Sequence, residues 1–391
     1  MKKSSLILTI ATGLVGFTTS LFAQIVIEHD VTPGNARPVY VNLSGMSGEA
    51  AQVIRFDLYV QGFAFTNAEA AQYAIAGSDN GNLQARANDL INKTTLFSKA
   101  YSGASLRRQA HAFVDDFVQA LNRKAIAQTK IAFKGSTSKG SEIFLADFDG
   151  SNAQAVTKDG STVAAPSMVP GRLGIYYVSY KLNHTDIFYQ DLSSGSRKIF
   201  ARFGGSNFSP AASPDGRKVA MILSKDGWTD LYVSDSDGSN LTRLTKSQQD
   251  ESSPCWSPDS RWICYAGKDG ERRVLRKITP SGGTPQSIPT SGFPSPSEPD
   301  WSPDGKLIAF TSQSGRYFQI CVVPAAGGPA VGLVEGEDPS WSPNSRTLAF
   351  ARRAGGSGDY VLSLLDVPTK QYKDVSRISG SNSQSQPSWA K

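Results

Sequence analysis

The sequence predicts an α+β protein in which a small N-terminal α/β domain precedes a six-bladed, all-β propeller that the C-terminal strand closes. Two observations predict this fold class. A short phrase, Pro-x-aromatic-Ser-Pro with a tight turn, recurs after residue 160 with starts 40–48 residues apart, a period typical of propeller blades. Residues 24–125 contain no copy of the phrase and include a stretch with helical spacing of apolar side chains.

The phrase has five full copies and one short copy, each starting at a proline. Proline presets the backbone for a turn, aspartate hydrogen-bonds nearby amides and glycine accepts positive φ, so the S-P-D-G part predicts a hairpin turn. The copies read P-S-M-V-P-G-R from Pro166, P-A-A-S-P-D-G from Pro210, P-C-W-S-P-D-S from Pro254, P-D-W-S-P-D-G from Pro299, P-S-W-S-P-N-S from Pro339 and P-S-W-A-K from Pro387.

The residues after each turn predict three further strands. In the copy that starts at Pro299, the runs Leu307–Phe310, Phe318–Val323 and Val331–Val334 are separated by a polar loop and a Gly-Gly turn. Each repeat thus supplies four short antiparallel strands, which make one blade. The aromatic position of the phrase is expected to pack between neighbouring blades. It holds Trp256, Trp301, Trp341 and Trp389, with Met168 and Ala212 in the weaker copies.

The two ends of the repeat region complement each other. Residues 129–157 contain three strands without an opening Pro-x-Trp strand, whereas residues 387–391 form an opening strand with nothing after it. We expect these fragments to share one blade, which with five complete repeats makes six blades over residues 126–391. Such closure removes the exposed sheet edges that would promote aggregation.

The first 23 residues are typical of a secretory signal peptide. Lys2 and Lys3 precede an apolar stretch from Leu6 to Phe22, and cleavage after Ala23 would leave 391 − 23 = 368 residues. An uncleaved anchor is the alternative. After Ala23 no apolar segment is long enough to span a membrane, so we expect an exported chain without a membrane span.

Residues 24–125 predict a small α/β domain that ends in a short connection at 122–128. Strands are expected at 25–27, 38–43, 73–76, 83–87 and 95–100, and a helix at 50–60. A second helix, expected to cover a sheet, runs from Leu106 to Leu121. Its apolar face comprises Leu106, Ala110, Phe113, Val114, Phe117, Val118 and Leu121.

Charge and cysteine content limit the possible partners. Without the two N-terminal lysines, 38 basic and 34 acidic residues leave a net charge of +4 that is scattered along the chain, which does not predict nucleic-acid binding. Cys255 and Cys264 flank one hairpin turn, so they either pair, leaving Cys321 buried, or all three remain free thiols. A monomer is expected.

An enzyme is the main alternative class. Peptidases with similar propellers need a hydrolase domain with a G-x-S-x-G motif, which this sequence lacks. His29 lies near the N-terminus, His111 on the predicted polar side of the helix and His184 in a blade loop, and no metal-ligand spacing joins them. No catalytic residue, metal site or cofactor is therefore predicted.

Two further patterns remain. Residues 147–152 and 235–240 mimic the start of a calcium loop, but they lack the downstream glutamate and fall where a blade needs a turn between its third and fourth strands. We interpret them as hairpins. A glycan-binding propeller is a further alternative, suggested by Tyr176, Tyr177 and Tyr180, which fall mostly within predicted strands.

Taken together, these features resemble the TolB family of the Tol-Pal system: a signal peptide, an I-V-I-x segment ending at Arg37-Pro38, a small α/β domain, and six blades of P-x-W-S-P-D-G closed by a terminal P-x-W. The stretch from Ala220 to Asp235 matches that family's blade pattern closely, and the resemblance covers essentially the whole chain after residue 23. Two departures stand out. The segment between Phe65 and Tyr73 is shorter than in the family, and the first blades lack its tryptophan.

The resemblance implies periplasmic binding without catalysis. TolB-like proteins hold the lipoprotein Pal on one mouth of the propeller, and the inner-membrane protein TolA recruits their N-terminal arm. The system supports outer-membrane integrity and envelope constriction in cell division. A short apolar arm can dock on its own domain or add to a partner's sheet, and a fixed edge strand is the alternative. Here the arm is residues 24–36, led by Gln24, Ile25, Val26, Ile27 and Glu28.

The mouth expected to bind a Pal-like lipoprotein is formed by two sets of loops. Loops that enter an opening strand supply Ser206, Asn207, Phe208, Asp250, Glu251, Ser252, Glu298, Glu337 and Asp338. Loops between the second and third strands supply Lys225, Asp226, Trp228, Gln313 and Arg316. No strand pattern requires burial of Trp228, so it is either an exposed binding residue or a cap on its own blade.

Overall fold

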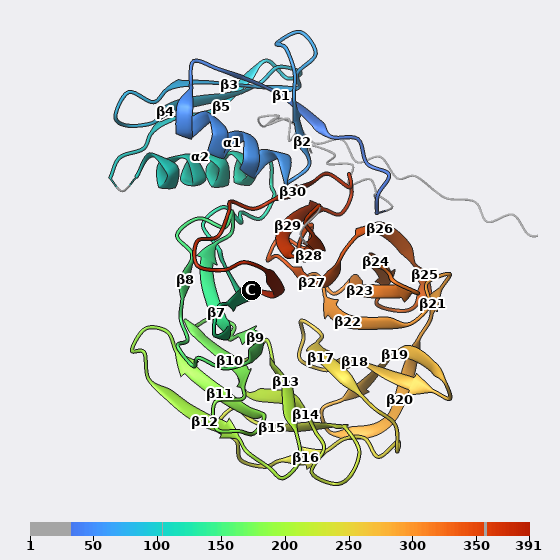
Figure 1. Cartoon of the computed structure of the whole chain (residues 1–391). Coiled ribbons are helices and arrows are strands. Elements are labelled where there is room, and N and C mark those ends of the chain that lie inside the picture. Colours follow the sequence, from blue (N-terminus) through green and yellow to red (C-terminus); the bar gives the residue numbers. More distant parts are fainter. Residues whose placement is uncertain (1–32, 104, 356–357) are drawn as a thin grey trace, which may run out of the picture. The chain divides into compact units, whose positions relative to one another are not determined.

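The computed structural model describes residues 33–103, 105–355 and 358–391, which belong to one compact unit. It confirms the predicted fold class, because a small α/β domain precedes a six-bladed propeller (Figure 1). The predicted signal peptide at 1–23 and the arm residues 24–32 lie outside the described residues.

The N-terminal domain is a five-stranded sheet with two helices along one face (Figure 1). Strand β1 lies between β2 and β3 and parallel to both, while β3, β4 and β5 are antiparallel neighbours. Strand β2 was not predicted, because three residues are too few to show alternation. The bounds are β1 Val39–Ser44, α1 Gly48–Tyr59, β2 Phe63–Phe65, β3 Tyr73–Ser78, β4 Gln84–Asp89, β5 Thr94–Ala100 and α2 Leu106–Ala120.

Helix α2 packs its predicted apolar face on this sheet. The Ser105 side chain caps its N-terminus by accepting a hydrogen bond from an amide of the first turn. Phe113 and Phe117 are fully buried, and the Phe117 ring lies 5.6 Å from that of Phe63 and 5.7 Å from that of Tyr73. The sequence therefore located this helix and its covered face correctly.

The propeller consists of six four-stranded sheets, which we number as blades 1–6. A small parallel pair, β21 with β25, links the ends of blades 4 and 5. The bounds are: blade 1, β31 Gln384–Trp389, β6 Lys130–Thr137, β7 Gly140–Asp147, β8 Gln154–Ala155; blade 2, β9 Val163–Met168, β10 Gly174–Ser179, β11 Asp186–Asp191, β12 Arg197–Ala201; blade 3, β13 Asn207–Ala212, β14 Lys218–Leu223, β15 Asp230–Asp235, β16 Thr242–Arg243; blade 4, β17 Ser252–Trp256, β18 Ile263–Asp269, β19 Arg272–Thr279, β20 Gly282–Ile288; blade 5, β22 Pro296–Trp301, β23 Leu307–Ser314, β24 Tyr317–Pro324, β26 Val331–Glu335; blade 6, β27 Glu337–Trp341, β28 Thr347–Arg353, β29 Tyr360–Asp366, β30 Tyr372–Asp374; and the linking pair, β21 Thr290–Ser291, β25 Gly328–Pro329.

The last strand closes the ring as predicted. Strand β31 pairs antiparallel with β6, with Trp389 opposite Ile131. The Trp389 side chain is 2 % exposed, and its indole N–H donates to the Thr129 hydroxyl at 2.7 Å. The predicted packing role of the aromatic position is also confirmed, since Trp256, Trp301 and Trp341 are buried too.

Every innermost strand has the same irregularity just before its proline. The six pre-proline residues all have positive φ, between 50° and 56°, and the strand pairing slips at each of these positions. Such a bulge kinks the strand and increases its twist. These residues are Ala165, Ser209, Ser253, Glu298, Asp338 and Gln386.

Side chains next to these prolines connect one blade to the next. At the pre-proline position, Glu298, Asp338 and Gln386 each accept a hydrogen bond from the pre-proline amide of the following blade, at 2.9–3.1 Å. At the post-proline position, four side chains accept from the amide of the next blade's aromatic position, at 2.6–3.2 Å. These acceptors are Ser167, Asp300, Ser340 and Ser388.

The N-terminal domain is attached to the propeller by direct hydrogen bonds to blade 6. The Thr347 hydroxyl donates to the Val60 carbonyl, and the Gln371 side chain donates to that of Phe63. The described base of the arm is also held there, because the amides of Gly34 and Ala36 donate to carbonyls of the turn after β29 at 3.0 and 2.9 Å.

A buried charge cluster completes the attachment. His111 is buried, so its predicted place on a polar helix face is wrong: α2 is covered by the propeller as well as by the sheet. Its Nδ1 lies 2.7 Å from a carboxylate oxygen of Asp57 on α1, and its Nε2 lies 3.5 Å from Asp149 in the β7–β8 turn. Arg107 also pairs with Asp149.

The charges of this cluster follow from burial and pairing. Burial alone would lower the pKa of His111, but the nearby Asp149 carboxylate and the hydrogen bond to Asp57, with the charges of both, outweigh burial and raise the pKa to about 10. Burial raises the pKa of Asp57 to about 7, whereas the histidine and the Ser151 groups hold the pKa of Asp149 below its usual range despite burial. His111 is thus a buried cation at neutral pH.

Replacing Trp389 with alanine should lower the free energy of unfolding by about 3–5 kcal/mol, because a cavity would open where the ring closes. Trp228→Ala is the matched control, since Trp228 is 47 % exposed and its loss should change stability by no more than about 0.5 kcal/mol. Denaturant unfolding of both variants checks this. Equal effects would contradict the closure role of Trp389.

The His111 cluster predicts a pH dependence. A histidine with a folded pKa raised above its unfolded value stabilises the fold below pH ~6.5, and this contribution is lost as the pH rises through about 10. The free energy of unfolding should therefore fall more steeply between pH 7 and 10 in the wild type than in His111→Gln. Parallel profiles from denaturant titrations at each pH would show that His111 is not charged in the folded state.

Candidate protein-binding face

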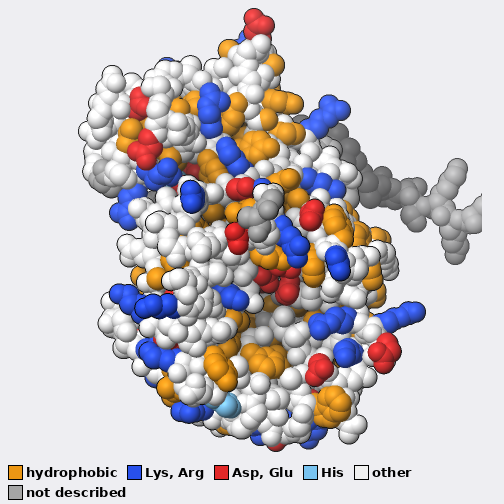
Figure 2. Space-filling view, in the orientation of Figure 1, with side chains coloured by type: hydrophobic (Ala, Val, Ile, Leu, Met, Phe, Trp, Pro, Cys, Tyr) orange, Lys and Arg blue, Asp and Glu red, His pale blue; other side chains and the backbone are white. Residues whose placement is uncertain are grey.

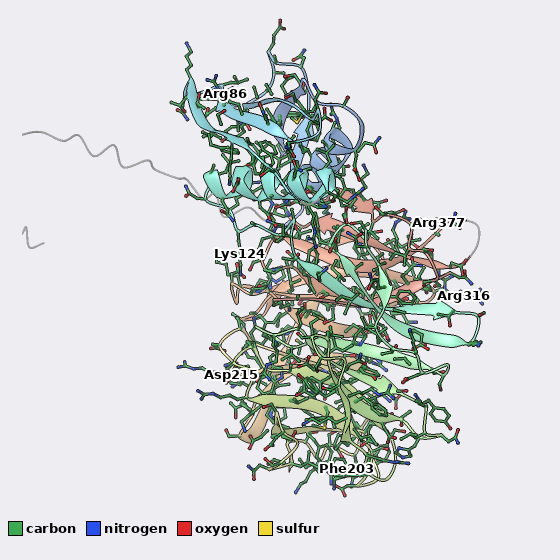
Figure 3. All side chains as sticks on the ribbon, turned by 90° about the vertical axis from the view of Figure 1, so that its left-hand side faces the viewer. Arg86, Lys124, Phe203, Asp215, Arg316 and Arg377 are labelled. Carbon is green, nitrogen blue, oxygen red and sulfur yellow. The ribbon has the colours of Figure 1, made fainter. Side chains whose placement is uncertain are left out.

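The two mouths of the propeller are built from different loops. Turns between first and second strands, such as that at Asp215, lie on one side, and loops between second and third strands, such as that at Arg316, lie on the other (Figure 3). Arg377, in a loop that leads into an opening strand, lies on the same side as Arg316 (Figure 3). We call this side the Arg316 face, and Figure 2 looks onto it.

All the propeller residues predicted to bind a partner belong to loops or strand ends of the Arg316 face, and they differ in exposure. The exposed ones are Lys225, Asp226, Trp228, Asp250, Gln313 and Arg316. Those partly buried are Ser206, Phe208, Ser252, Glu298, Glu337 and Asp338. The two that are buried are Asn207 and Glu251.

The two buried residues hold the loops in place. The Asn207 side chain donates to the carbonyls of Thr185 and Phe203, both at 3.0 Å. Glu251 accepts hydrogen bonds from the Leu231 amide and the Thr245 hydroxyl. A loop residue that turns inward has the same sequence pattern as one that turns outward, so only the structure separates these positioning residues from the exposed ones.

Trp228 projects from blade 3 beside a fixed pair of charges. Trp228 is 47 % exposed. The Lys225 ammonium and the Asp226 carboxylate are 3.0 Å apart, and the hydroxyl of Tyr232 on β15 donates to that carboxylate at 2.6 Å. Strand β15 therefore supports the loop through Tyr232, and the Trp228 side chain is exposed to solvent beside this charged pair.

Acidic side chains gather near the centre of the Arg316 face (Figure 2). Glu298 accepts hydrogen bonds from the Asp338 amide at 3.1 Å and from the Thr311 hydroxyl at 2.7 Å. Burial and the charge of Glu298 raise the pKa of Asp338 well above its usual range. Burial, and less so Glu298, also raises the pKa of Glu337. A cationic group placed here by a partner would relieve this repulsion.

This acidic centre leads into the channel along the propeller axis. The channel is a cavity of about 480 Å³ lined by the innermost strands of all six blades. Its wall carries the repeated prolines and, from the last residue, the Lys391 ammonium, which pairs with Asp300 at 2.7 Å. The sequence placed these residues in strands but did not show that they share one cavity.

Further exposed apolar side chains on the Arg316 face were not predicted to bind a protein partner, although Tyr180 was noted as a hint of glycan binding. Tyr180 and Leu182 lie in the β10–β11 loop of blade 2, and Tyr317 begins β24 of blade 5; all are at least 40 % exposed. Tyr180 and Trp228 thus occupy corresponding loops of neighbouring blades. Aligning the repeats at this loop would have found them, because no strand pattern requires these side chains to be buried.

The described residues contain no group of three or more His, Cys, Asp or Glu side chains that could hold a metal ion. His111 is committed to the domain contact, and Nδ1 of His184 pairs with Asp186 at 2.7 Å. The aspartate-rich segments at 147–152 and 235–240 are turns between third and fourth strands, as predicted.

Within the described ranges, no helix has the length and apolar character needed to cross a membrane.

Comparison with known proteins identifies relatives by name. A protein from Geobacter sulfurreducens named Tol-Pal system protein TolB is 36 % identical over 101 residues, covering 25 % of this chain and 23 % of the relative. Its namesake from Geobacter metallireducens is 32 % identical over 152 residues, covering 31 % and 35 %. These alignments thus span only about a quarter and a third of the relatives' length.

A solved structure and a family profile extend the likeness to the whole fold. TolB from Acinetobacter baumannii superposes on 92 % of this chain and 98 % of its own, with a TM-score of 0.81 at 20 % identity, which shows a shared fold. The profile of the TolB beta propeller domain matches residues 119–391. Because this match spans well over half of the sequence, the chain belongs to the TolB beta propeller domain family.

Proposed function

We propose that this protein is a non-catalytic, monomeric adaptor of the Tol-Pal envelope system in the periplasm, which binds a Pal-like lipoprotein on the Arg316 face. The observation that carries the proposal is the composition of that face. Exposed aromatic side chains of blades 2, 3 and 5 share this face with an acidic, partly buried centre, and exposed aromatic residues are typical of protein-binding surfaces.

The contact surface that we propose is smaller than the predicted set. Trp228, Lys225, Asp226, Asp250, Gln313 and Arg316 meet the partner directly, and Ser206, Phe208, Ser252, Glu298, Glu337 and Asp338 line the approach to the channel. Asn207 and Glu251 keep the loops in shape. Lysine or arginine side chains of the lipoprotein would enter the acidic centre, where low solvent exposure strengthens their attraction.

The second partner that we propose is a TolA-like inner-membrane protein bound by the arm. Residues 24–32, led by Gln24, Ile25, Val26, Ile27 and Glu28, are apolar enough to add a strand to a partner's sheet. Support comes from the described base of the arm, where Gly34 and Ala36 are hydrogen-bonded to the turn after β29. A change in the structure of blade 6 would therefore act on the arm through these hydrogen bonds.

This function places the protein between two membranes. After removal of residues 1–23, the domain at 24–125 and the propeller at 126–391 would connect the lipoprotein with the inner-membrane partner, and so support outer-membrane integrity and envelope constriction during cell division. Neither nucleic acid nor a cofactor takes part in this proposal.

Trp228→Ala should weaken binding of the purified lipoprotein at least ~30-fold, equivalent to about 2 kcal/mol, because a central aromatic side chain carries a large share of an interface's energy. Leu173→Ala is the matched control: Leu173 is 50 % exposed in the turn between β9 and β10, on the opposite side of the ring. Isothermal titration measures both. Equal losses, or none for Trp228→Ala, would place the binding surface elsewhere.

Deleting residues 24–32 should abolish capture of the TolA-like protein and leave the affinity for the Pal-like lipoprotein within about twofold, since the deletion spares the base held by Gly34 and Ala36. Pull-down with each partner, using the chain that starts at Pro33, makes the comparison. Retention of both interactions would refute the role of the arm. Unchanged thermal unfolding of the shortened chain serves as the folding control.

A further inference from the structure

Cys255 and Cys264 lie directly opposite each other on the two innermost strands of blade 4. Cys255 is on β17 and Cys264 is its register partner on β18. Both are buried free thiols. Cys255 also lines the central channel, whereas Cys321 lies opposite Phe310 and Gly332 on its neighbouring strands.

The same two positions in other blades show what this pair replaces. The post-proline residue and its partner are Ser340 and Ala349 in blade 6, and Ala211 and Ala220 in blade 3. Blades 1 and 5 likewise place alanine at the partner position. Packing in those blades is satisfied by alanine, so two opposed cysteines in blade 4 are not required by the shape of the repeat.

Blade 4 also lacks the connections that other blades make through these positions. At the pre- and post-proline positions of the described strands, no side chain of blade 3 accepts from blade 4 and none of blade 4 accepts from blade 5, unlike the junctions that involve Ser340 or Ser388. The Ala211 side chain has no acceptor group, although its carbonyl accepts from the Trp256 indole at 2.9 Å, and the thiol of Cys255 replaces a hydroxyl or carboxylate. At these positions blade 4 is therefore held by fewer side-chain hydrogen bonds around the channel.

The spacing of the pair suits a covalent bond. Opposed residues of antiparallel strands have Cβ atoms about 4.5–5.5 Å apart, and a disulfide needs about 3.5–4.5 Å, so a movement of the strands on the order of 1 Å closes the gap. Cys255 and Cys264 are separated by a tight hairpin turn, so they also meet early when the chain folds.

We propose that Cys255 and Cys264 form a cross-strand disulfide that fastens the innermost strand of blade 4. The inference goes beyond the proposed adaptor function and uses only one part of it, export to an oxidising compartment. The co-reactant is a thiol–disulfide oxidant of that compartment. One cysteine thiolate attacks the oxidant's disulfide and forms a mixed disulfide with it. The second cysteine then attacks this mixed disulfide and releases the oxidant, so the pair loses two protons and two electrons and the oxidant becomes a dithiol.

Burial of the two thiols determines when the disulfide can form. Burial and the adjacent Cys264 side chain raise the pKa of the Cys255 thiol well above its usual range, so little thiolate forms once the blade has folded. The bond therefore forms during folding, while the hairpin is open to the oxidant. Cys321 has no cysteine opposite it and remains a thiol.

The test is to refold the full chain in a buffer of oxidised and reduced glutathione, block thiols with N-ethylmaleimide under denaturing conditions and map the peptides by mass spectrometry. One labelled cysteine, Cys321, and one linked peptide pair with Cys255 and Cys264 are expected. Three labelled cysteines, or a linked pair that includes Cys321, would overturn the proposal. The readout does not depend on either partner, so it stands apart from the test of the adaptor function.

A second measurement follows stability, with variants taken from the protein's own repeats. The oxidised wild type should melt about 3–6 °C above the same protein after reduction with dithiothreitol. Cys255→Ser with Cys264→Ala reproduces the Ser340 and Ala349 pair of blade 6 and should show no response to the reductant. Cys321→Ser should respond like the wild type. A melting temperature that reduction leaves unchanged in the wild type would show that the strand is not fastened there.

Discussion

Pairing of the first and last strands of the repeat region is the interaction on which the other contacts depend. Antiparallel pairing of β31 with β6 brings together residues about 250 positions apart and gives blade 1 its innermost strand. Trp389 fills the space between blades at this junction, and its indole reaches Thr129 just ahead of β6. Because the β7–β8 turn of the closing blade also carries Asp149, the same blade receives the N-terminal domain through His111.

A backbone bulge in each innermost strand allows hydrogen bonds between neighbouring blades of the ring. Each innermost strand carries a pre-proline residue in the left-handed region, and the bulge there directs neighbouring amides across the blade boundary. Seven of the side chains beside these prolines accept such amides, as Ser388 does from blade 2 and Glu298 does from blade 6. Among the described residues, the pre-proline serines of blades 3 and 4, Ser209 and Ser253, make no such bond, and blade 4 is the blade that carries the opposed Cys255 and Cys264.

Strands and loops of each repeat have different roles, which explains how one repeat can support the proposed binding face. Strand residues and turns are fixed by packing, whereas loops between second and third strands are free to carry Trp228, Tyr180 or Arg316. Acidic residues that serve ring contacts, such as Glu298, also give the channel entrance its charge. The side chains that connect neighbouring blades at the entrance thus also make the proposed binding face acidic there.

By itself, the sequence determined the blade number, the closing strand, the buried tryptophans and the covered face of α2, because period, turn chemistry and helical spacing are local properties that survive any arrangement of the chain. Only the tertiary structure decided which loop residues face outward: Asn207 and Glu251 turn inward to hydrogen-bond their own loops, while Trp228 does not. It also decided that His111 is buried and which side chains beside the prolines accept hydrogen bonds from the next blade. The partners of these residues lie on other elements, and local sequence spacing does not show which distant residues come together.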